Sequence, residues 1–231
     1  MKLHILLLVP ALIAVTFLCA AAGEGGGGGG DMTAKEGKRI ELPVVTGYGG
    51  FPLDQALGTR RSVREYTDDK LDIVVISKLL WSAQGMTEKK YGLRTAPSAG
   101  ATYPLEVYVA TEEYVARYDP SKHDLTVTLK GDVRTALAKA ALDQPWVEKA
   151  PAVFVFAAVV SRTAGRYGGR AERYVKIEVG LASENLMLQA VALGLGSVAV
   201  GAYDDDDVKD VLQLPDEQDV YLLVPVGRPA E

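Results

Sequence analysis

The sequence predicts an α+β domain in which one mixed sheet is packed with helices. Segments 105–110 and 151–160 are short and rich in apolar and β-branched residues, as strands are. Segments 71–81 and 174–195 instead repeat apolar residues at helical spacing. Strand-like and helix-like segments are interleaved along the chain, so both antiparallel and parallel connections are expected.

The composition narrows the classes of function. The chain has 231 residues, 48% of them hydrophobic, and a formal net charge of −5. This acidic balance argues against a general nucleic-acid-binding protein, because binding to a phosphate backbone depends on clustered Lys and Arg. The single cysteine is Cys19, and the two histidines are His4 and His123. The body of the chain therefore offers no disulfide and no zinc site. Its one histidine, His123, is interpreted as a loop residue, which argues against a Ser-His-Asp hydrolase.

The first 22 residues have the pattern of a secretory signal peptide. Lys2 precedes an apolar run at 5–18, and small residues follow at 20–23. Because the apolar run is short for a membrane-spanning helix, we expect export to the periplasm or to the outside of the cell. A lipid anchor at Cys19 and an uncleaved membrane anchor are the two alternatives.

A glycine-rich linker follows the leader over residues 23–39. It contains an unbroken glycine run at 25–30, which makes a flexible tether and carries no fold. The folded domain is expected over 40–231, and about 200 residues are enough for one large domain with its own core.

The first half of this body contains one clear helix and one unusual loop. The helix over 71–84 can take its cap from Asp68 or Asp69, and Gly85 gives it a stop. Small residues in the loop 94–104 leave backbone N–H groups open to a flat ligand. The other predicted elements here are a short extended segment at 40–45, a turn-rich loop at 47–52, a helical turn at 53–57 and the strand at 105–110.

Four consecutive aspartates at 204–207 stand out in the second half. They lack the ligand spacing and the glycine turn of a calcium loop. We interpret them as the acidic start of a helix over 208–212, a position that the helix dipole favours. Asp132 is likewise expected to cap a helix over 133–142. The other predicted elements are a hairpin of 115–118 and 125–129, a basic loop or helix start at 162–173, a turn into a short strand at 194–203, and a last strand at 220–226.

Three features are typical of a ligand site. Segment 60–64 reads Arg-Arg-Ser-Val-Arg, and arginine presents a fork of donors that fits phosphate or carboxylate. The loop 97–101 and the turn 194–202 consist of small residues, and Arg228 follows an apolar strand. A solvated basic face is the alternative for segment 60–64. Because the body offers no clear nucleophile or general base, we expect a cofactor to carry the chemistry.

Four motifs occur in order along the body and carry a resemblance to a known family. They are Arg-Arg-Ser-Val-Arg at 60–64, Leu-Leu-Trp-Ser-Ala-Gln-Gly at 79–85, the stretch 94–108 that begins Arg-Thr-Ala-Pro-Ser-Ala-Gly, and 192–202 with the terminal pair Gly227-Arg228. Together they resemble the nitroreductase-like FMN flavoprotein family, and within it the SagB/ThcOx-type dehydrogenases. The resemblance covers residues 53–229, almost the whole body.

This resemblance implies an FMN-binding domain that forms an intertwined homodimer, with FMN at the subunit interface. Cations of the basic segment would hold the flavin phosphate, ribityl chain and pyrimidine edge, a small-residue loop of the other subunit would face the ring, and a second small-residue stretch would line it near N5. The implied residues are Arg60, Arg61, Ser62, Arg64 and Arg228 in the first group, Pro97, Ser98 and Gly100 in the second, and Ala199, Val200 and Gly201 in the third.

The resulting functional hypothesis is an FMN-dependent oxidoreductase that moves a hydride through flavin N5 to or from a small organic substrate. The flavin itself is the reactive group, no side chain is assigned a catalytic role, and NADH or NADPH is the candidate electron donor. The alternatives are a flavin-binding accessory protein or electron carrier without turnover, an azoline-oxidising dehydrogenase of peptide modification, and a remnant that has lost FMN.

Overall fold

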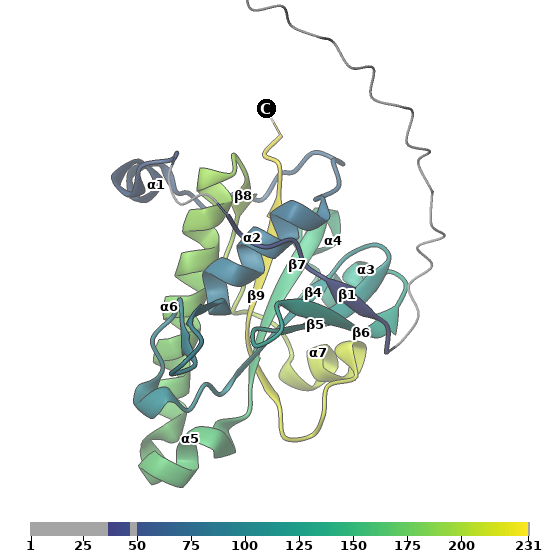
Figure 1. The fold of residues 1–231 in the computed structure, drawn as a ribbon. Helices are drawn as coiled ribbons and strands as arrows, with labels where there is room; N and C mark the ends of the chain where they lie inside the picture. The colour runs from purple at the N-terminus through teal and green to yellow at the C-terminus, as the bar shows by residue number, and fades with distance from the viewer. Residues whose placement is uncertain (1–36, 47–49, 231) are drawn as a thin grey trace, which may run out of the picture. The chain divides into compact units, whose positions relative to one another are not determined.

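The computed structural model describes residues 37–46 and 50–230 (Figure 1). The predicted leader with its two anchor alternatives, and the glycine run of the linker, lie outside these residues. The predicted extended segment at 40–45 is a shorter strand, β1 (Arg39–Glu41). In the described part of the chain, no helix combines the length and the apolar character needed to cross a bilayer.

The centre of the fold is a seven-stranded sheet with the strand order β1-β6-β5-β4-β7-β9-β8. Neighbouring strands pair antiparallel, and a parallel bridge between Ser62 and Ser197 at one edge makes the sheet mixed, as predicted. The other strands are β4 (Leu105–Ala110), β5 (Tyr114–Asp119), β6 (Asp124–Lys130), β7 (Ala152–Ala158), β8 (Gly196–Ser197) and β9 (Asp219–Gly227).

Strands β4, β7 and β9 form the middle of the sheet. Every residue of β4 and β7 is buried, and the two strands pair from Leu105 opposite Ala158 to Ala110 opposite Val153. The continuous apolar sequence of β7 is thus explained by cover on both faces of the sheet. The predicted strands at 105–110, 151–160 and 220–226, and the predicted hairpin of β5 and β6, are confirmed.

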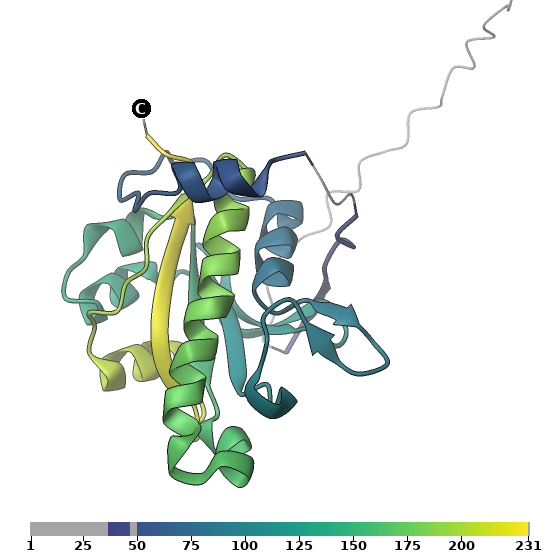
Figure 2. The same ribbon diagram turned by 90° about the vertical axis from the view of Figure 1, so that its left-hand side faces the viewer.

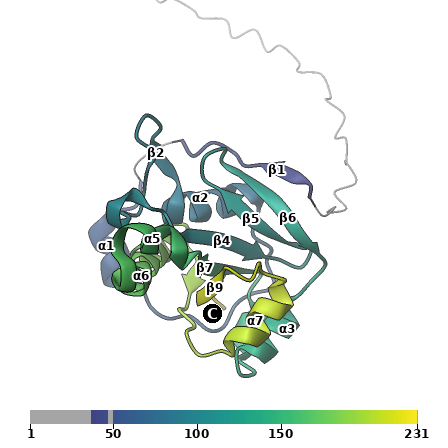
Figure 3. The ribbon, with the colours of Figure 1, turned by 90° about the horizontal axis from the view of Figure 1, so that it is seen from below.

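Helices cover both faces of the sheet (Figures 1 and 3). One face packs its alternate residues, such as Phe154 and Phe156, against Leu79 and Leu186 of two helices. The opposite face packs Val155 and its neighbours against three shorter helices. The first pair is α2 (Ile73–Gln84) and α6 (Ala171–Ala192), and the second set is α3 (Arg134–Ala140), α4 (Pro145–Lys149) and α7 (Asp205–Leu212).

Both predicted N-caps differ from those in the structure. Helix α2 is capped by Asp72, which accepts a hydrogen bond from Val75 N–H at 2.8 Å, and not by Asp68 or Asp69. The cap position of α3 is Val133 and not Asp132, but the Asp132 carboxylate does accept a hydrogen bond from the first helical N–H, that of Arg134, at 3.0 Å and also binds the Arg134 side chain. An aspartate can reach only N–H groups two or three positions ahead, so the first helical residue decides which one caps.

The aspartates at 204–207 do begin a helix, as predicted. Asp204 is the cap of α7 and accepts a hydrogen bond from Asp207 N–H at 3.1 Å. The basic segment 162–173 is also helical. The remaining elements are α1 (Leu53–Thr59), α5 (Val160–Tyr167), short 3-10 turns at 99–101 and 168–170, and a small hairpin of β2 (Met86–Glu88) and β3 (Leu93–Arg94), which the sequence reading did not predict.

Candidate functional site

The basic segment 60–64 runs along the edge of the sheet beside β8 and the end of β9. Val63 N–H donates to the Ser197 carbonyl at 3.0 Å, and Ser62 forms the parallel bridge to the same residue. Farther on, Thr67 N–H donates to the Arg228 carbonyl at 2.9 Å. The structure therefore brings the basic segment and Arg228 together, although they lie at opposite ends of the body sequence.

Two glycines make this close approach possible. A Cβ atom on Gly196 would lie 2.6 Å from Val63, and one on Gly227 would lie 2.7 Å from Pro151 and 2.8 Å from Tyr66. Atoms in real side chains do not approach this closely. The strand ends must therefore carry glycine where the basic segment crosses them.

Tyr66 fixes the far end of the segment. Its hydroxyl lies 2.6 Å from the Val63 carbonyl and 3.3 Å from the Pro225 carbonyl, within hydrogen-bond distance of both. The ring is buried, and this burial raises the pKa of Tyr66 above its usual value. The phenol thus stays neutral and holds the segment against β9.

The arginine side chains of the segment have few partners in the chain. Arg60 Nε lies 3.4 Å from Glu184 of α6, and Arg228 Nε lies 3.3 Å from Asp69, both in exposed pairs that contribute little stability. Arg61 donates to the Arg60 carbonyl at 2.7 Å, and the Arg64 guanidinium lies 5.2 Å from the centre of the Trp146 ring. Within the described residues, neither Arg61 nor Arg64 pairs with a carboxylate. With Ser62 also exposed, this group of cations can take an anion.

The loop with Pro97, Ser98 and Gly100 lies elsewhere in the chain. Ser98 Oγ accepts a hydrogen bond from Tyr103 N–H at 2.9 Å, and Arg166 donates to the Gly100 carbonyl at 3.3 Å. Gly100 has a φ of 61°, which glycine adopts without strain. The loop is therefore held in a fixed conformation against α5.

Within one chain the structure does not bring this loop to the basic segment. Helix α5 precedes the start of α6, whereas β8 follows the end of α6 (Figures 1 and 2). A 22-residue helix is about 33 Å long. This separation agrees with a loop that serves the site of another subunit, and that role remains a prediction.

The three residues expected near N5 differ in their surroundings. Val200 is buried, and its backbone N–H and C=O bond to Leu223 at 2.8 and 3.0 Å. Ala199 and Gly201, on either side of it, are exposed. Val200 therefore anchors the stretch in the core, while its two small neighbours are open to a ligand.

Glu178 is a polar residue of the site region that the sequence reading missed. It is 3% exposed, on α6 behind the Ser98 loop. Burial raises the pKa of Glu178 to about 7, while hydrogen bonding from Ser98 and the charge of Arg94 act against this rise. In the sequence it occurs within an apolar helical pattern, and nothing local indicates that it faces inward.

His123 is a loop residue with a structural role, as its sequence context predicted. Its Nε2 lies 2.9 Å from Ser77 Oγ, and its Nδ1 lies 2.8 Å from the Tyr118 hydroxyl. The Ser77 hydroxyl itself donates to the Pro43 carbonyl at 2.7 Å. The hydroxyl of this buried serine thus serves to hold neighbouring segments together. Over residues 37–46 and 50–230, no group of three potential metal ligands gathers closely enough to hold an ion.

A protein-family model and known sequences match this chain. The model of the nitroreductase family matches residues 57–228. A protein of Methanocaldococcus jannaschii that carries the name of a nitroreductase is 43% identical over 185 residues, which cover 78% of this chain and 92% of that protein. A protein of Methanothermobacter thermautotrophicus named for NADH dehydrogenase and NAD(P)H nitroreductase is 25% identical over 181 residues, 77% of each chain.

Solved structures show the same fold. A nitroreductase-named protein from Ralstonia eutropha matches with a TM-score of 0.76 at 30% identity, over 84% of this chain and 90% of that chain. The NADPH:FMN oxidoreductase from Vibrio harveyi, solved with NAD+, matches with a TM-score of 0.58 at 19% identity, over 78% and 69%. The family match spans every strand of the central sheet except β1, the helices that cover the sheet, the basic segment and Arg228, and this chain belongs to the nitroreductase family.

Proposed function

We propose that the protein is an FMN-dependent oxidoreductase that acts on a small organic substrate. The observation that carries this proposal is the position of the basic segment 60–64, which backbone hydrogen bonds hold beside Arg228. Most of the arginines in this segment have no carboxylate partner among the described residues. A phosphate monoester is the ligand group that such a fixed, exposed set of guanidinium donors fits.

The residues of the chain would divide the work of binding. Arg60, Arg64 and Arg228 neutralise and orient the phosphate end, and Ser62 adds a hydroxyl donor. Ala199 and Gly201 leave room beside the ring for a substrate, because neither carries a large side chain. When bound, FMN supplies the redox chemistry, accepting a hydride and passing its electrons on.

We propose that a second copy of the chain completes the site. The loop of Pro97, Ser98 and Gly100 is remote from the basic segment of its own chain. Helix α6 leaves Ile177 and Leu181 exposed, at 50% and 43%, which suits a helix that packs against a partner. An intertwined homodimer is also what the resemblance to this family implies. A homodimer would bring the loop of one subunit to the basic segment of the other.

NADPH or NADH is the proposed electron donor. The name of the Vibrio harveyi relative states NADPH and FMN for that protein, and the name of the Methanothermobacter thermautotrophicus relative states NADH and NAD(P)H. A place among the SagB/ThcOx-type dehydrogenases, with oxidation of azoline rings in peptides, is the narrower version of the same proposal. It rests on the four ordered motifs at 60–64, 79–85, 94–108 and 192–202 with Gly227-Arg228.

The test is a visible absorbance scan of the purified full-length protein, before and after NADPH and then NADH are added without oxygen. We expect a flavin spectrum that bleaches. A flavin spectrum that both donors leave unchanged would contradict the nicotinamide part of the proposal and favour the electron carrier. Absence of flavin binding, even after FMN is added back, would overturn the proposal as a whole.

We also propose that residues 1–22 direct export of the protein. Because nicotinamide cofactors are scarce outside the cytoplasm, an exported enzyme would use another donor or pass electrons to oxygen or another acceptor, and NADPH or NADH would serve it only if the leader is an anchor that leaves the domain facing the cytoplasm. The export proposal rests on the basic start, the short apolar run and the small residues that follow it. Cell fractionation of the full chain, with mass spectrometry of its N-terminus, tests it. A cleaved N-terminus near residue 23 outside the cytoplasm is the expected result, whereas an intact Met1 in the cytoplasm would overturn it.

A further inference from the structure

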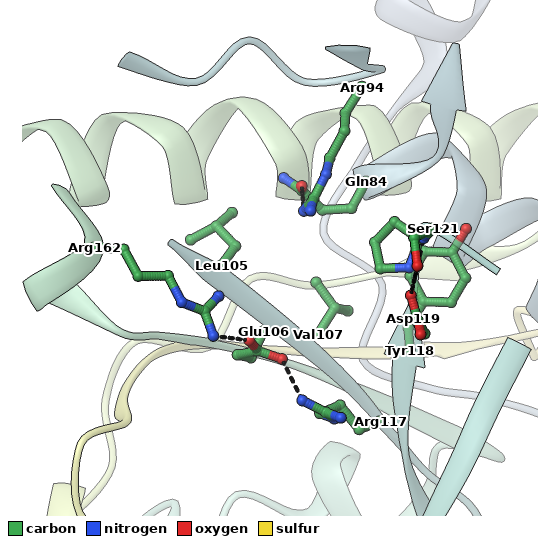
Figure 4. Close-up of a pocket in the computed structure, with 11 residues that line it drawn as sticks. Gln84, Arg94, Leu105, Glu106, Val107, Arg117, Tyr118, Asp119, Ser121 and Arg162 are labelled. Atoms are coloured by element: carbon green, nitrogen blue, oxygen red, sulfur yellow. Dashed lines mark hydrogen bonds and ion pairs between the residues drawn. The ribbon is translucent and has the colours of Figure 1, made fainter. Parts of the chain in front are cut away.

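A second cluster of charged side chains surrounds a cavity of about 230 Å³ at the start of β4 (Figure 4). Its wall comes from segments far apart in the sequence. Arg94 enters it from the end of β3, Arg117 from β5, Arg162 from the first turn of α5, and Glu106 from β4. None of these residues belongs to the basic segment 60–64 or to the small-residue stretches.

The cavity exists because β4 and β5 diverge. Their pairing runs from Ala110 opposite Val115 to Tyr108 opposite Arg117 and goes no farther toward the start of β4. Residues Leu105 to Val107 of β4 therefore have no β5 residue paired opposite them, and they line the cavity instead. The opening is formed by strand geometry, and the charged side chains converge on it from its rim.

Glu106 is shared by two arginines. Its Oε1 lies 2.5 Å from Arg162 Nη2, and its Oε2 lies 3.2 Å from Arg117 Nη1. The Glu106 side chain is only 9% exposed, whereas both arginines keep over 40% of their side-chain surface open. One carboxylate therefore positions two guanidinium groups and neutralises only one of their two charges.

Arg94 adds a third positive charge. Its Nη1 donates to Gln84 Oε1 at 2.9 Å, and its guanidinium lies 4.3 Å from the centre of the Tyr103 ring. Its Nε is buried and has no hydrogen-bond partner among the described residues. A buried donor without an acceptor costs free energy, so this side of the cavity is short of acceptors.

Asp119, the other acidic residue that lines the cavity, interacts with residues of its own turn. Asp119 accepts hydrogen bonds from Ser121 N–H and from the Ser121 hydroxyl, and Lys122 Nζ lies 2.9 Å from its carboxylate. Its charge is thus balanced within its own turn. The lining of the cavity is left with three guanidinium groups and one facing carboxylate, Glu106. Glu178 lies outside this lining but close enough to Arg94 for their charges to interact, and burial raises the pKa of Glu178 to about 7, so it offsets the charge of Arg94 only where it is ionised.

We propose that this cavity binds a small oxyanion that carries a carboxylate or phosphate group. The ligand supplies the acceptors and the negative charge that Arg94, Arg117 and Arg162 lack, and it fits the bidentate donor geometry of arginine. No residue of this wall is among those assigned to FMN, and the proposal stands without that assignment.

Occupancy of the cavity would also affect the loop that leads to Ser98. Arg94 stacks on Tyr103, and Arg162 Nη1 lies 3.4 Å from the Tyr103 carbonyl. Tyr103 N–H in turn donates to Ser98 Oγ. An anion that fixes these two arginines therefore stabilises the conformation of the loop from residue 95 to residue 103.

The experiment is titration calorimetry and thermal unfolding of the full-length protein with inorganic phosphate and, separately, succinate. FMN is kept at saturation, so that phosphate cannot report on the basic segment, and sodium chloride at equal ionic strength is the reference. Arg117→Gln removes one donor while Glu106 keeps Arg162. Arg170→Gln is the matched control, because Arg170 is exposed, loses the same charge and lies outside the cavity.

We expect saturable binding of at least one anion to the wild type and to Arg170→Gln, about tenfold weaker in Arg117→Gln, since one charge-assisted hydrogen bond is lost. A response to phosphate alone or to succinate alone identifies which group the site selects. Equal binding by Arg117→Gln and wild type, or a response that sodium chloride reproduces, would overturn the proposal. A phosphate response lost in Arg64→Gln but kept in Arg117→Gln would assign the signal to the FMN site and also overturn it.

Discussion

The protein holds two groups of arginines, and they are built in opposite ways. The basic segment 60–64 is contiguous in sequence and is held by its backbone, and it keeps Arg61 and Arg64 exposed and Arg60 partly exposed. The cavity at β4 draws Arg94, Arg117 and Arg162 from three distant segments, and a nearly buried carboxylate, Glu106, orders two of them. The first group is open to a large ligand, whereas the second can hold only a small one.

The two groups differ in the kind of interaction that positions their arginines. Main-chain hydrogen bonds to Ser197 and Arg228 place the first group, so its side chains remain free for an anion. Side-chain contacts to Glu106 and Tyr103 place the second group, so removal of one member disturbs the others. Variants should therefore affect mainly binding in the first group and stability in the second.

Glu178 provides the largest test, because it decides whether Arg94 has a counterion. Its pKa of about 7, raised by burial, lies above the ordinary value of 4.5. Between pH 4.5 and 7 the folded state keeps a proton that the unfolded chain releases, so stability falls as pH rises through this window and levels off above it. We expect Glu178→Gln to avoid this loss and to gain up to about 3 kcal/mol over wild type between pH 4 and pH 9.

Urea unfolding at a series of pH values measures this effect. The control is Glu184→Gln on the same helix, which removes a carboxylate that is 42% exposed and pairs only at the surface with Arg60. If wild type and Glu178→Gln have parallel pH profiles, Glu178 is ionised at neutral pH and Arg94 has a negative partner. That outcome would remove the contrast between the two arginine groups.

Glu106→Gln tests the order of the cavity. It leaves Arg117 and Arg162 without the carboxylate that holds both, and we expect the free energy of unfolding to fall by about 2 kcal/mol, less than for a fully buried pair because the arginines are partly exposed. FMN affinity should stay within about twofold of wild type. Glu112→Gln, which breaks the exposed pair with Lys70, is the control and should cost at most about 1 kcal/mol. Equal effects of the two changes would contradict the role given to Glu106.

Arg64→Gln tests the basic segment. The guanidinium lies over Trp146 and forms no ion pair in the described chain, so stability should change little while FMN binds about tenfold more weakly. Fluorescence titration with FMN measures the affinity, and Arg170→Gln controls for the loss of one positive charge. A stability loss without a change in affinity would reverse the comparison.

Tyr66→Phe gives the smallest expected effect. It removes the hydroxyl that joins the Val63 and Pro225 carbonyls, and one such hydrogen bond contributes about 1 kcal/mol. Thermal unfolding measures this loss, and Tyr91→Phe, at an exposed position, should have no measurable effect. If Tyr66→Phe changes neither stability nor FMN affinity, the backbone bonds to Ser197 and Arg228 hold the segment without it.

Much of the fold could be predicted from local patterns. The segments 105–110 and 151–160 are both rich in apolar and β-branched residues, and both formed strands where expected; in the structure every residue of β4 and β7 is buried. Helix caps were less predictable, since Asp68, Asp69 and Asp72 are all able to cap and only the exact helix start selects Asp72. The hairpin of β2 and β3 was missed because its strands are too short to show a period.

The candidate site was predictable to the extent that it is contiguous. Segment 60–64 shows in the sequence because its cations are neighbours, and its proximity to Arg228 follows only from the sheet order. Glu106 and Glu178 could not be found in the same way. Each sits in an apolar segment, and whether a single carboxylate points inward depends on packing with residues far along the chain.

The contact between Tyr66, at the end of the basic segment, and Pro225 of β9 has a consequence for folding kinetics. Tyr66 and Pro225 are 159 residues apart, and closing so long a loop is slow until the intervening structure has formed. The site formed by the basic segment 60–64 and Arg228 is therefore among the last parts of the fold to assemble. Collapsed intermediates with intact helices lack it. Recovery of anion binding after dilution from denaturant would then report completion of the native topology, later than the recovery of helical signal.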